Sequence, residues 1–281
     1  MICADALSWL KHDTAMLPGS VFTSLPDITE IMHLFGGDVE TEKIPAYKSW
    51  FVDVVSLLCS KIKPTECIIF LQSDVRHINN VKTHQNYGCV SEWIDKASLC
   101  SEGVANHGGM KCLWHKICLV RAIDTKCMGR PAYSHLICFG HNEFRYKSNA
   151  FMTPDVFNRG DMLWPKGIGI HAGLMGTNFI RNVMKSTHII DPFCGHGTVL
   201  ALAEAIGIEN AVGVEISGKR CKKASLLEVY STLKTFSHAN LRLFGCAEDS
   251  ITRLVKTPLE DLLVEREALA VSIVTHDSGI S

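Results

Sequence analysis

The chemically most suggestive residues of the chain are two acids, two glycines and a threonine in its second half: Asp191, Gly195, Gly197, Thr198 and Glu215. Glycines let the backbone approach a ligand closely, and a helix that begins at Thr198 presents unpaired N–H groups to that ligand. The carboxylate of Glu215 is suited to accept hydrogen bonds from two ribose hydroxyls. The pattern therefore predicts a site for a nucleoside-like cofactor.

Two strands and a helix are needed to position these residues. An apolar run ends at Asp191, and apolar residues at helical spacing follow Thr198. A second apolar run, at 211–214, ends at Glu215. Two parallel strands joined by a helix bring the loop and Glu215 to neighbouring strand ends, where open α/β sheets bind ligands.

The same loop distinguishes between cofactors. The dinucleotide fingerprint places a third glycine where this chain has Leu200, so NAD and FAD are disfavoured. The carboxylate of Asp191 would repel a pyrophosphate, whereas it suits a cofactor with an ammonium and a sulfonium group. S-adenosylmethionine carries both charges, and we expect it as the cofactor. The alternative, a redox enzyme on a Rossmann-like sheet, predicts nicotinamide binding.

Residues 191–198 read DPFCGHGT and closely resemble the DPFCGxGT cofactor loop of class I S-adenosylmethionine-dependent methyltransferases, particularly those acting on nucleic acid. The triplet GVE at 213–215 is similar to the ribose-binding strand end of these enzymes. The resemblance implies a Rossmann-like α/β sheet, mostly parallel with one antiparallel strand, and helices on both faces. It also implies a set of cofactor-binding residues: Asp191, Pro192, Phe193, Gly195, Gly197, Thr198 and Glu215.

The strands that complete such a sheet are predicted before the cofactor loop. The sequence after Glu215 offers a Lys-rich helical stretch, a strand-like run and an amphipathic segment, at 219–233, 241–246 and 259–269. It provides no clear pair of closing strands. Strand-like runs at 20–23 and 67–72 lie in the N-terminal half. We therefore predict a permuted strand order.

The permuted order resembles that of the amino-methyltransferases of DNA and RNA, whose target motif, D/N/S-P-P-Y/F, precedes the cofactor loop. Ser24-Leu25-Pro26-Asp27 takes the place of that motif. Leu25 replaces the first proline, and Asp27 replaces the aromatic residue that would stack on a flipped base. The resemblance implies catalytic roles for Ser24, Pro26 and Asp27. Ser24 and a backbone carbonyl would hold the nucleophile, and Asp27 would accept or orient a proton.

Two points in this comparison stay open. A turn in which Asp27 caps a helix from residue 28 also explains the motif. Asp5 takes the place of the acid near the adenine, and Glu248 or Asp249 is the alternative.

A polar cluster and a hairpin are predicted on the target side. Residues 73–76 (SDVR) follow the strand at 67–72 and either line the ligand crevice or form a helix cap with a surface ion pair. Runs at 111–120 and 132–139 suit the antiparallel pair that closes the sheet. The candidates there for stacking on a base or binding phosphate are Trp114, His115, Arg130, Tyr133 and His135. Helices are predicted at 47–62, 90–104 and 178–184.

Composition limits the class of protein. The 281 residues are 47% hydrophobic with a formal net charge of −1, which fits a globular protein without a global field for nucleic acid. No apolar run reaches the roughly 18 residues that span a bilayer. The N-terminus lacks a secretion signal, so we expect a cytoplasmic protein with no membrane partner. The twelve cysteines form no CxxC pair, so neither a metal site nor a disulfide framework is predicted.

We expect residues 1–281 to form one permuted methyltransferase domain. Its target-motif half spans 1–140, a connection spans 141–165, and its cofactor-binding half spans 166–281. Residues 173–178 are expected to contribute at the methionine end of the cofactor.

The predicted function is S-adenosylmethionine-dependent methylation of RNA, either tRNA or rRNA, in preference to DNA. A basic footprint for the nucleic acid is predicted at 219–223 and 121–130. One alternative is a methyltransferase for small molecules or proteins. Another is a non-catalytic, cofactor-binding regulatory subunit.

Overall fold

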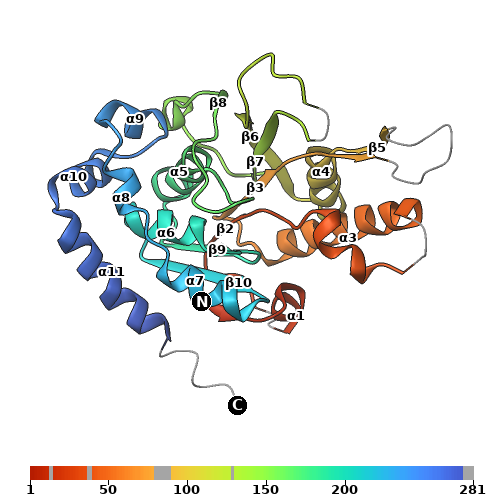
Figure 1. The fold of residues 1–281 in the computed structure, drawn as a ribbon, viewed down its shortest axis with the longest axis horizontal. Helices are drawn as coiled ribbons and strands as arrows, with labels where there is room; N and C mark the ends of the chain where they lie inside the picture. Colours follow the sequence, from red (N-terminus) through yellow and green to blue (C-terminus); the bar gives the residue numbers. More distant parts are fainter. Residues whose placement is uncertain (13–14, 37–39, 79–89, 128–129, 275–281) are drawn as a thin grey trace.

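The computed structural model describes residues 1–12, 15–36, 40–78, 90–127 and 130–274. Its main feature is an eight-stranded sheet in the spatial order β1-β10-β9-β2-β3-β7-β6-β8 (Figure 1). The strands are β1 (Ile2–Cys3), β2 (Ser20–Thr23), β3 (Cys67–Gln72), β6 (Met110–Leu119), β7 (Tyr133–His141), β8 (Val156–Asn158), β9 (His188–Asp191) and β10 (Asn210–Glu215). A separate two-stranded sheet pairs β4 (Val75–Ile78) with β5 (Val90–Ile94).

The strand directions confirm the predicted sheet. Within the described part of the chain, β7 runs antiparallel to both of its neighbours, β3 and β6. The other strand pairs of the large sheet are parallel. The predicted hairpin is formed by β6 and β7. The edge strand β8, parallel to β6, was not predicted, and it lies in the segment expected to be only a connection.

The strand order also confirms the permutation. β9, which leads into the cofactor loop, pairs with β10 on one side and with β2 from the N-terminal half on the other. From here the chain proceeds in opposite directions, from β9 to β10 one way and from β2 to β3 the other. The boundary between β9 and β2 is therefore a topological switch point, where open α/β sheets bind ligands.

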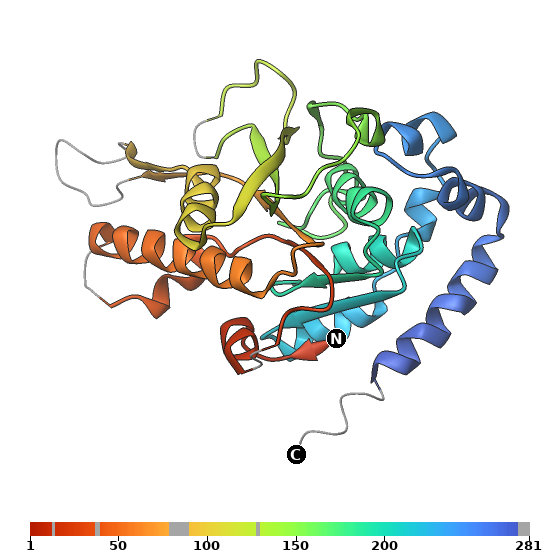
Figure 2. The same ribbon diagram turned by 180° about the vertical axis from the view of Figure 1, so that it is seen from behind.

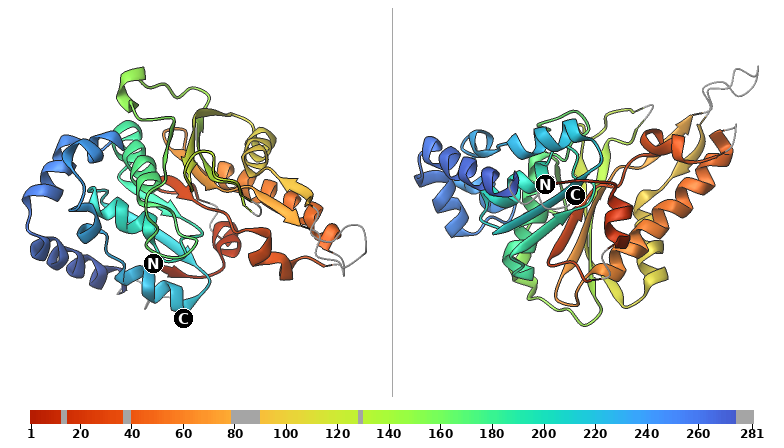
Figure 3. Two further views of the ribbon diagram at one scale, coloured as in Figure 1. Left: turned by 45° about the horizontal axis from the view of Figure 1, so that its top comes forward. Right: turned by 90° about the horizontal axis from the view of Figure 1, so that it is seen from below.

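Helices cover both faces of the sheet (Figure 2, Figure 3). Alternation along β3 shows the reason, because successive side chains of a strand point to opposite faces. Ile68 and Phe70 pack in one core with α1 (Ala6–His12), α3 (Glu40–Lys61) and α4 (Lys96–His107). Ile69 and Leu71 pack in a second core with α5 (Ile170–Phe179) and α6 (Thr198–Ala205). The protein is thus built in three layers.

Shorter helices complete the described structure. They are α2 (Ile28–Ile31), α7 (Gly218–Leu226), α8 (Tyr230–Leu233), α9 (His238–Leu243), α10 (Glu248–Lys256), α11 (Leu259–Val274), the 3₁₀ turns Met32–Leu34 and Ser148–Phe151, and the π-helix Ile180–Met184. No helix in these described ranges is both long enough and apolar enough to cross a bilayer.

Some predictions of secondary structure are wrong. The helix predicted at 90–104 is instead β5 followed by α4, because the side chain of Asp95 accepts a hydrogen bond from Ser98 N at 2.8 Å and starts the helix there. The strand-like run at 241–246 contains the end of α9 and a turn at Gly245, whose φ is 83°. The single helical stretch at 219–233 is divided into α7 and α8.

Candidate active site

The cofactor loop joins the end of β9 to the start of α6. Gly195 and Gly197 have positive φ angles of 54° and 80°, a region that favours glycine. A Cβ atom at Gly197 would stand 2.9 Å from the Cβ of Ala224 in α7, whereas no described atom lies within 4 Å of one at Gly195. The loop is therefore packed at Gly197 and open at Gly195, where a ligand can approach the backbone.

Asp191 is the buried acid at the base of this loop. It accepts hydrogen bonds from Thr23 Oγ1 at 2.6 Å and from the backbone N–H of Phe193 at 3.2 Å. Burial raises the pKa of Asp191 to about 7, the two hydrogen bonds oppose the rise, and the Glu215 carboxylate adds to it. The bond from Thr23 also ties the end of β2 to the cofactor loop across the switch point.

Glu215 ends β10 and lies beside Asp191. Gly213 is the register partner of Asp191, so Glu215 lies two residues beyond that pair. Its Oε1 accepts a hydrogen bond from the N–H of Ser217 at 2.8 Å, and Arg220 Nη1 lies 3.8 Å away. Two buried carboxylates repel each other, so this edge of the sheet favours a ligand with positive charge.

The remaining predicted loop residues hold the loop in place. Pro192 and Thr198 are buried, and Phe193 packs against the core that contains α3. Cys194 donates its backbone N–H to the carbonyl of Val214 at 3.1 Å, which ties the loop to β10. The structure thus brings the predicted loop residues and Glu215 to one edge of the sheet.

Asp5 follows β1 at the same edge. Cys3 is the register partner of Glu215, so Asp5 lies two residues beyond the paired strand end. Its carboxylate accepts hydrogen bonds from the N–H and the hydroxyl of Ser8, at 2.8 and 2.7 Å, and begins α1. Asp5 therefore lies on the side where the resemblance places the adenine-side acid, and it also caps a helix.

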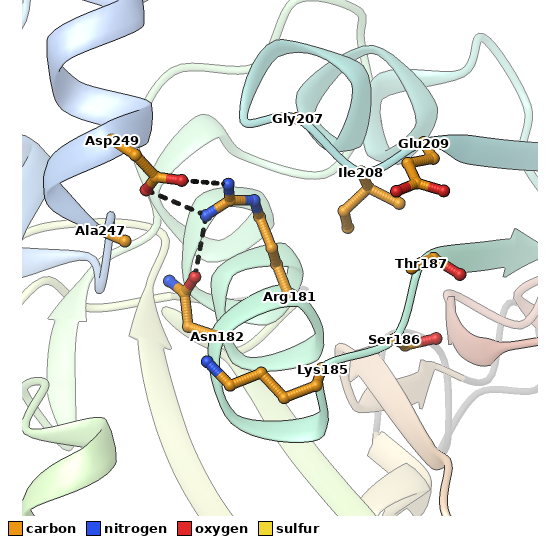
Figure 4. Close-up of a pocket in the computed structure, with 10 residues that line it drawn as sticks. All are labelled: Arg181, Asn182, Lys185, Ser186, Thr187, Gly207, Ile208, Glu209, Ala247 and Asp249. Atoms are coloured by element: carbon orange, nitrogen blue, oxygen red, sulfur yellow. Dashed lines mark hydrogen bonds and ion pairs between the residues drawn. The ribbon is translucent and has the colours of Figure 1, made fainter.

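The alternative acids, Glu248 and Asp249, are the first two residues of α10. They lie near the amino ends of the strands, whereas Glu215 lies at a carboxyl end. Asp249 pairs with Arg181 Nη2 at 2.5 Å on the wall of a cavity of about 350 Å³ (Figure 4). That cavity is bounded by the turns that precede β9 and β10, so it lies at the amino ends of these strands. The structure separates both acids from Glu215 and leaves Asp5 as the candidate.

The predicted target motif ends in a cluster of ion pairs. Asp27 pairs with Lys96, the first residue of α4, and with Arg130 Nη1 at 2.5 Å. Burial alone would raise the pKa of Asp27, but Lys96 and Arg130 outweigh it and hold that pKa below its usual value. The hydroxyl of Tyr47 donates to the carbonyl of Pro26 at 3.0 Å. Of the two predicted roles, this arrangement favours Asp27 as an orienting anion over Asp27 as a proton acceptor.

The motif also begins a helix, as the alternative interpretation expected. α2 starts directly after Asp27, and the side chain of Glu30 accepts a hydrogen bond from the N–H of Asp27 at 3.1 Å. Asp27 forms a capping box with Glu30, and its carboxylate also makes the two ion pairs. The two interpretations of the motif are therefore compatible.

The polar cluster after β3 lies next to the target motif. Asp74 is buried and accepts hydrogen bonds from three groups, which are Lys96 N at 3.0 Å, Trp93 Nε1 at 3.3 Å and His135 Nε2 at 3.2 Å. Lys96 thus contacts Asp74 through its backbone and Asp27 through its ammonium group. Lys96 therefore links the segment that follows β2 to the segment that follows β3.

The candidates on the hairpin separate in space. Three of them form a row with ring centroids 5.1 and 5.2 Å apart: His115, His135 and Tyr133. Arg130 reaches the target motif. Trp114 lies in the other core, with its ring centroid 5.4 Å from that of Phe151. The structure therefore gathers four of the five candidates and places Trp114 in the packing of the opposite face.

Gln72, at the end of β3, lies next to the polar cluster and carried no sequence signal. Its side chain is 1% exposed, and neither amide atom has a hydrogen-bond partner among the described residues. It is the register partner of His135, and side chains of paired residues lie on the same face. A buried unpaired amide costs about 1–3 kcal/mol. Such a group is satisfied by an ordered water or held for a ligand, which makes Gln72 a candidate position.

Trp164 is a second residue that the sequence did not single out. Its ring stacks on His196 of the cofactor loop, with centroids 4.5 Å apart and an interplanar angle of 14°. Lys223 Nζ of α7 lies 5.1 Å from the same ring. The indole N–H is buried and has no partner in the described ranges. The segment before α5 therefore reaches over the loop.

The glycines at 173–178 have a packing role in the structure. They lie inside α5, where a Cβ at Gly173 would stand 2.3 Å from Leu202 and one at Gly176 would stand 2.4 Å from Phe22. Close contact with α6 and the sheet requires glycine at both positions. A contribution of 173–178 to the methionine end of the cofactor stays a prediction.

No family model and no curated protein matches the chain. Solved structures do match. A candidate DNA modification methylase from Thermus thermophilus is 14% identical over 79% of this chain and 91% of that chain, with a TM-score of 0.55. Its complex with S-adenosyl-L-methionine is 13% identical over 79% and 90% of the two chains, with a TM-score of 0.54. PvuII DNA methyltransferase, named as cytosine-N4-specific, is 12% identical over 91% and 92%, with a TM-score of 0.51. The chain has the class I methyltransferase fold.

Within this fold, three neighbouring strands carry the predicted cofactor residues. The cofactor loop follows β9, Glu215 ends β10, and Asp5 follows β1. On the other side of the switch point, β2 and β3 lead into the target motif and Asp74. The residues predicted to bind the cofactor and those of the predicted target motif therefore follow neighbouring strands of one sheet.

Proposed function

We propose that this chain is an S-adenosylmethionine-dependent methyltransferase that acts on a nitrogen atom of a nucleic acid. The observation that carries the proposal is the hydrogen bond from Thr23 to Asp191 at 2.6 Å. It joins the loop after β9 to the motif after β2 at the switch point, so a methyl donor and a nucleophile bound to them would meet. Direct transfer between two bound groups depends mainly on such positioning.

The residues of the loop fit S-adenosylmethionine better than a dinucleotide. Asp191 and Glu215 repel each other, and an ammonium or sulfonium group would relieve that repulsion, whereas a pyrophosphate would add to it. Gly195 leaves its side of the backbone open to a ligand. Glu215 can accept hydrogen bonds from a ribose. When bound there, the cofactor would supply an electrophilic methyl group on sulfur.

The target motif would hold the acceptor. The Pro26 carbonyl accepts one hydrogen bond from Tyr47 and keeps a second lone pair, so it can orient a nitrogen nucleophile together with Ser24. Asp27, held between Lys96 and Arg130, fixes the motif against α4 and the connection between β6 and β7.

Charge and aromatic rings around the site support a nucleic-acid acceptor. α7 begins soon after Glu215 and exposes four cations: Lys219, Arg220, Lys222 and Lys223. The aromatic residue that the target motif lacks has substitutes in the row of His115, His135 and Tyr133. Trp93 is 40% exposed, and Arg76 lies 4.8 Å from its ring. Bases stack on groups of this kind, and cations contact the phosphates.

RNA and DNA are the two nucleic acids to be distinguished. The sequence-based prediction favours tRNA or rRNA. The structural neighbours are named as DNA methylases, one of them cytosine-N4-specific, which supports DNA. Bases of both nucleic acids present nitrogen nucleophiles, so one site architecture serves either acceptor.

Transfer of a tritiated methyl group from S-adenosylmethionine to RNA, DNA and protein fractions tests the proposal. We expect label in a nucleic acid, and nucleoside mass spectrometry of that fraction then identifies the methylated base. Asp191→Asn should greatly reduce the label. Label confined to protein, or no transfer by a protein that binds the cofactor, would contradict the proposal. The regulatory-subunit alternative predicts that Asp27→Ala leaves cellular methylation unchanged.

A further inference from the structure

Three side chains of the kinds that bind metal ions lie together beside the carboxyl end of β3. They are Asp74, which follows that strand, Asp95, which precedes α4, and His135 on β7. One ligand atom of each, a carboxylate oxygen or a ring nitrogen, lies within 4.8 Å of those of the other two. Their segments are neighbours in the fold, since α4 contacts both β3 and β7 (Figure 1). A single ion holds its ligand atoms up to about 4.4 Å apart, so small movements of these side chains would close a site.

Two of these side chains are acids without a cationic side chain to neutralise them. Asp74 is 2% exposed, and Asp95 is exposed. Within the described chain, neither forms an ion pair with a lysine or an arginine. The ammonium group of Lys96, which follows Asp95 directly, contacts Asp27. Two carboxylates this close repel each other, and a cation between them would relieve that repulsion.

Both acids are held in place by hydrogen bonds from their surroundings. Asp74 accepts one from Lys96 N at 3.0 Å and one from Trp93 Nε1 at 3.3 Å. Asp95 accepts one from Ser98 N at 2.8 Å through its Oδ1, so its Oδ2 is the atom that can turn to an ion. Outer partners of this kind orient the ligands of metal sites.

His135 presents its Nε2 to the same point. That atom lies 3.2 Å from Asp74 Oδ2, and the other ring nitrogen, Nδ1, lies 2.9 Å from Nε2 of His115. An imidazole that binds a metal through Nε2 carries its hydrogen on Nδ1 and donates it to a neighbouring acceptor. His115 Nε2 is in position to be that acceptor. An ion would thus replace the contact between Asp74 and His135, and His115 would fix the orientation of the ring.

A buried amide lies on the same face of the sheet. Gln72 is 1% exposed, and neither of its amide atoms has a hydrogen-bond partner among the described residues. It is the register partner of His135, so the Cβ atoms of the two residues stand about 4.5–5.5 Å apart on one face. Its carbonyl oxygen can bind an ion or accept a hydrogen bond from a water on that ion. A bond between Asp74 and His135 and a cap at Asp95 explain the other three side chains without an ion, but they leave this amide unpaired.

The set of ligand atoms favours zinc among the common divalent ions. Imidazole nitrogen suits transition metals, whereas magnesium and calcium prefer oxygen ligands alone. Zinc binds histidine nitrogen at about 2.0–2.1 Å and carboxylate oxygen at about 2.0–2.2 Å, usually with four ligands. Two carboxylates and one imidazole supply three of these, and the amide of Gln72 or a water supplies the fourth. The exposed side chain of Asp95 leaves a path by which the ion can enter.

We propose that Asp74, Asp95 and His135 form a binding site for a divalent transition-metal ion, best filled by zinc. The three residues are far apart in the sequence, so no short spacing indicates the site. The ion would join the segment after β3 to β7 and to the start of α4. Because Lys96 follows Asp95 and contacts Asp27, the ion would also hold the start of α4 beside the target motif. The proposal does not depend on the proposed function.

Calorimetric titration of the full-length, metal-free protein with zinc chloride tests the proposal, with its thiols kept reduced. We expect one zinc ion per chain at this site. Asp95→Asn should weaken the affinity for zinc at least about tenfold, because the change removes a charged ligand. Asparagine caps a helix as well as aspartate does, so this variant should fold. His135→Gln should weaken the affinity by at least as much.

Urea unfolding gives a second measure of the same binding. Zinc at about 100 times the Kd of the wild type should raise the ratio of folded to unfolded wild-type protein about 100-fold. The same concentration should raise the ratio for Asp95→Asn no more than about tenfold. Unfolding curves without zinc show directly that each variant is folded.

Asp5→Asn is the matched control. Asp5 begins α1 with the same cap that Asp95 gives α4, because each Oδ1 accepts a hydrogen bond at 2.8 Å from the N–H of the serine three residues later. Four strands separate β1, which Asp5 follows, from β7 in the sheet. The affinity of Asp5→Asn for zinc should therefore stay within about twofold of the wild type.

Cobalt as a probe distinguishes this site from one formed by some of the twelve cysteines. Thiolate ligands give bound Co²⁺ intense charge-transfer bands in the near ultraviolet, and imidazole and carboxylate ligands do not. We expect weak visible bands without the thiolate bands, and we expect them to disappear in His135→Gln.

Three results would each overturn the proposal. They are no binding of zinc by the wild type, an affinity for zinc that Asp95→Asn and His135→Gln leave unchanged, and thiolate bands from bound cobalt. None of these measurements uses S-adenosylmethionine or a nucleic acid, so their failure would not affect the proposed function. A protein that binds zinc at this site but transfers no methyl group would contradict the proposed function alone.

Discussion

Replacement of Asp191 by asparagine should stabilise the protein and weaken its affinity for S-adenosylmethionine. Asparagine has the same shape, and its Oδ1 can still accept the hydrogen bond that Thr23 now donates at 2.6 Å. The substitution therefore removes the charge and little else. Stability should rise while ligand affinity falls, because the buried charge destabilises the folded protein but attracts the ligand.

The effect on stability follows from the raised pKa. Burial moves the pKa of Asp191 from 3.8 to about 7, so the folded state binds this proton more tightly than the unfolded state does. The contribution of Asp191 to the free energy of unfolding is fully present below pH 3.8 and is lost as the pH rises through about 7. The loss is about 1.4 kcal/mol per pH unit, or about 4 kcal/mol in total. The asparagine side chain does not titrate, so the free energy of unfolding of the variant should not fall over this pH range. At pH 8 it should exceed that of the wild type by about 2–4 kcal/mol.

The effect on affinity has the opposite sign. A hydrogen bond between charged groups contributes about 1.5–3 kcal/mol, so its loss should weaken the binding of S-adenosylmethionine about 10- to 100-fold at pH 8. In the wild type the affinity should fall as the pH drops below about 7, because Asp191 then becomes neutral.

Urea unfolding and calorimetry between pH 5.5 and 8 test both effects. Asp249→Asn is the control, because Asp249 is 64% exposed and pairs with Arg181 at the far edge of the sheet. It should change stability by less than about 1 kcal/mol and leave binding unchanged. If Asp191→Asn lost stability equally at every pH, or bound the cofactor as tightly as the wild type, the argument from a buried, repelled carboxylate would be refuted.

Three further predictions concern single positions of the site. Glu215→Gln should weaken the binding of S-adenosylmethionine and S-adenosylhomocysteine alike, about tenfold by calorimetry, because both ligands carry the ribose. Gly197→Ala should lower the free energy of unfolding in urea by about 1–2 kcal/mol or more, because its φ is 80° and its Cβ would stand 2.9 Å from Ala224. Gly195→Ala should lower it less, because only the positive φ opposes that substitution. Gln72→Met should raise the free energy of unfolding by about 1–3 kcal/mol, because it removes a buried unpaired amide. It should also slow methyl transfer to the labelled acceptor. A destabilised variant with normal activity would contradict a ligand site at Gln72.

The central strands could be predicted because each is a short apolar run with a clear end. β3 and β9 are buried on both faces, so their sequences show continuous hydrophobicity, and the acid at 191 marks where β9 stops. The helix predicted at 90–104 failed because Trp93 and Ile94 have helical spacing with later residues. In the structure the side chain of Asp95 caps a helix that begins at Lys96, so residues 90–94 stay a strand.

The two parts of the site differ in how much the sequence reveals. The residues from Asp191 to Thr198 are contiguous, so a motif identifies them. The row of His115 and His135, and its contact with Asp74, depends on the register of β3, β6 and β7, which the sequence does not specify. Lys96 carried no signal at all, because a lysine at a helix start is ordinarily a surface residue.

A crystal structure of the protein with S-adenosylmethionine tests the central claim most directly. We predict that its ribose hydroxyls contact Glu215 and that its amino-acid end lies over the bend from Gly195 to Gly197, next to Asp191. Cofactor bound at the cavity beside Arg181, or side chains of the protein filling the space over Gly195 when the ligand is present, would contradict the account.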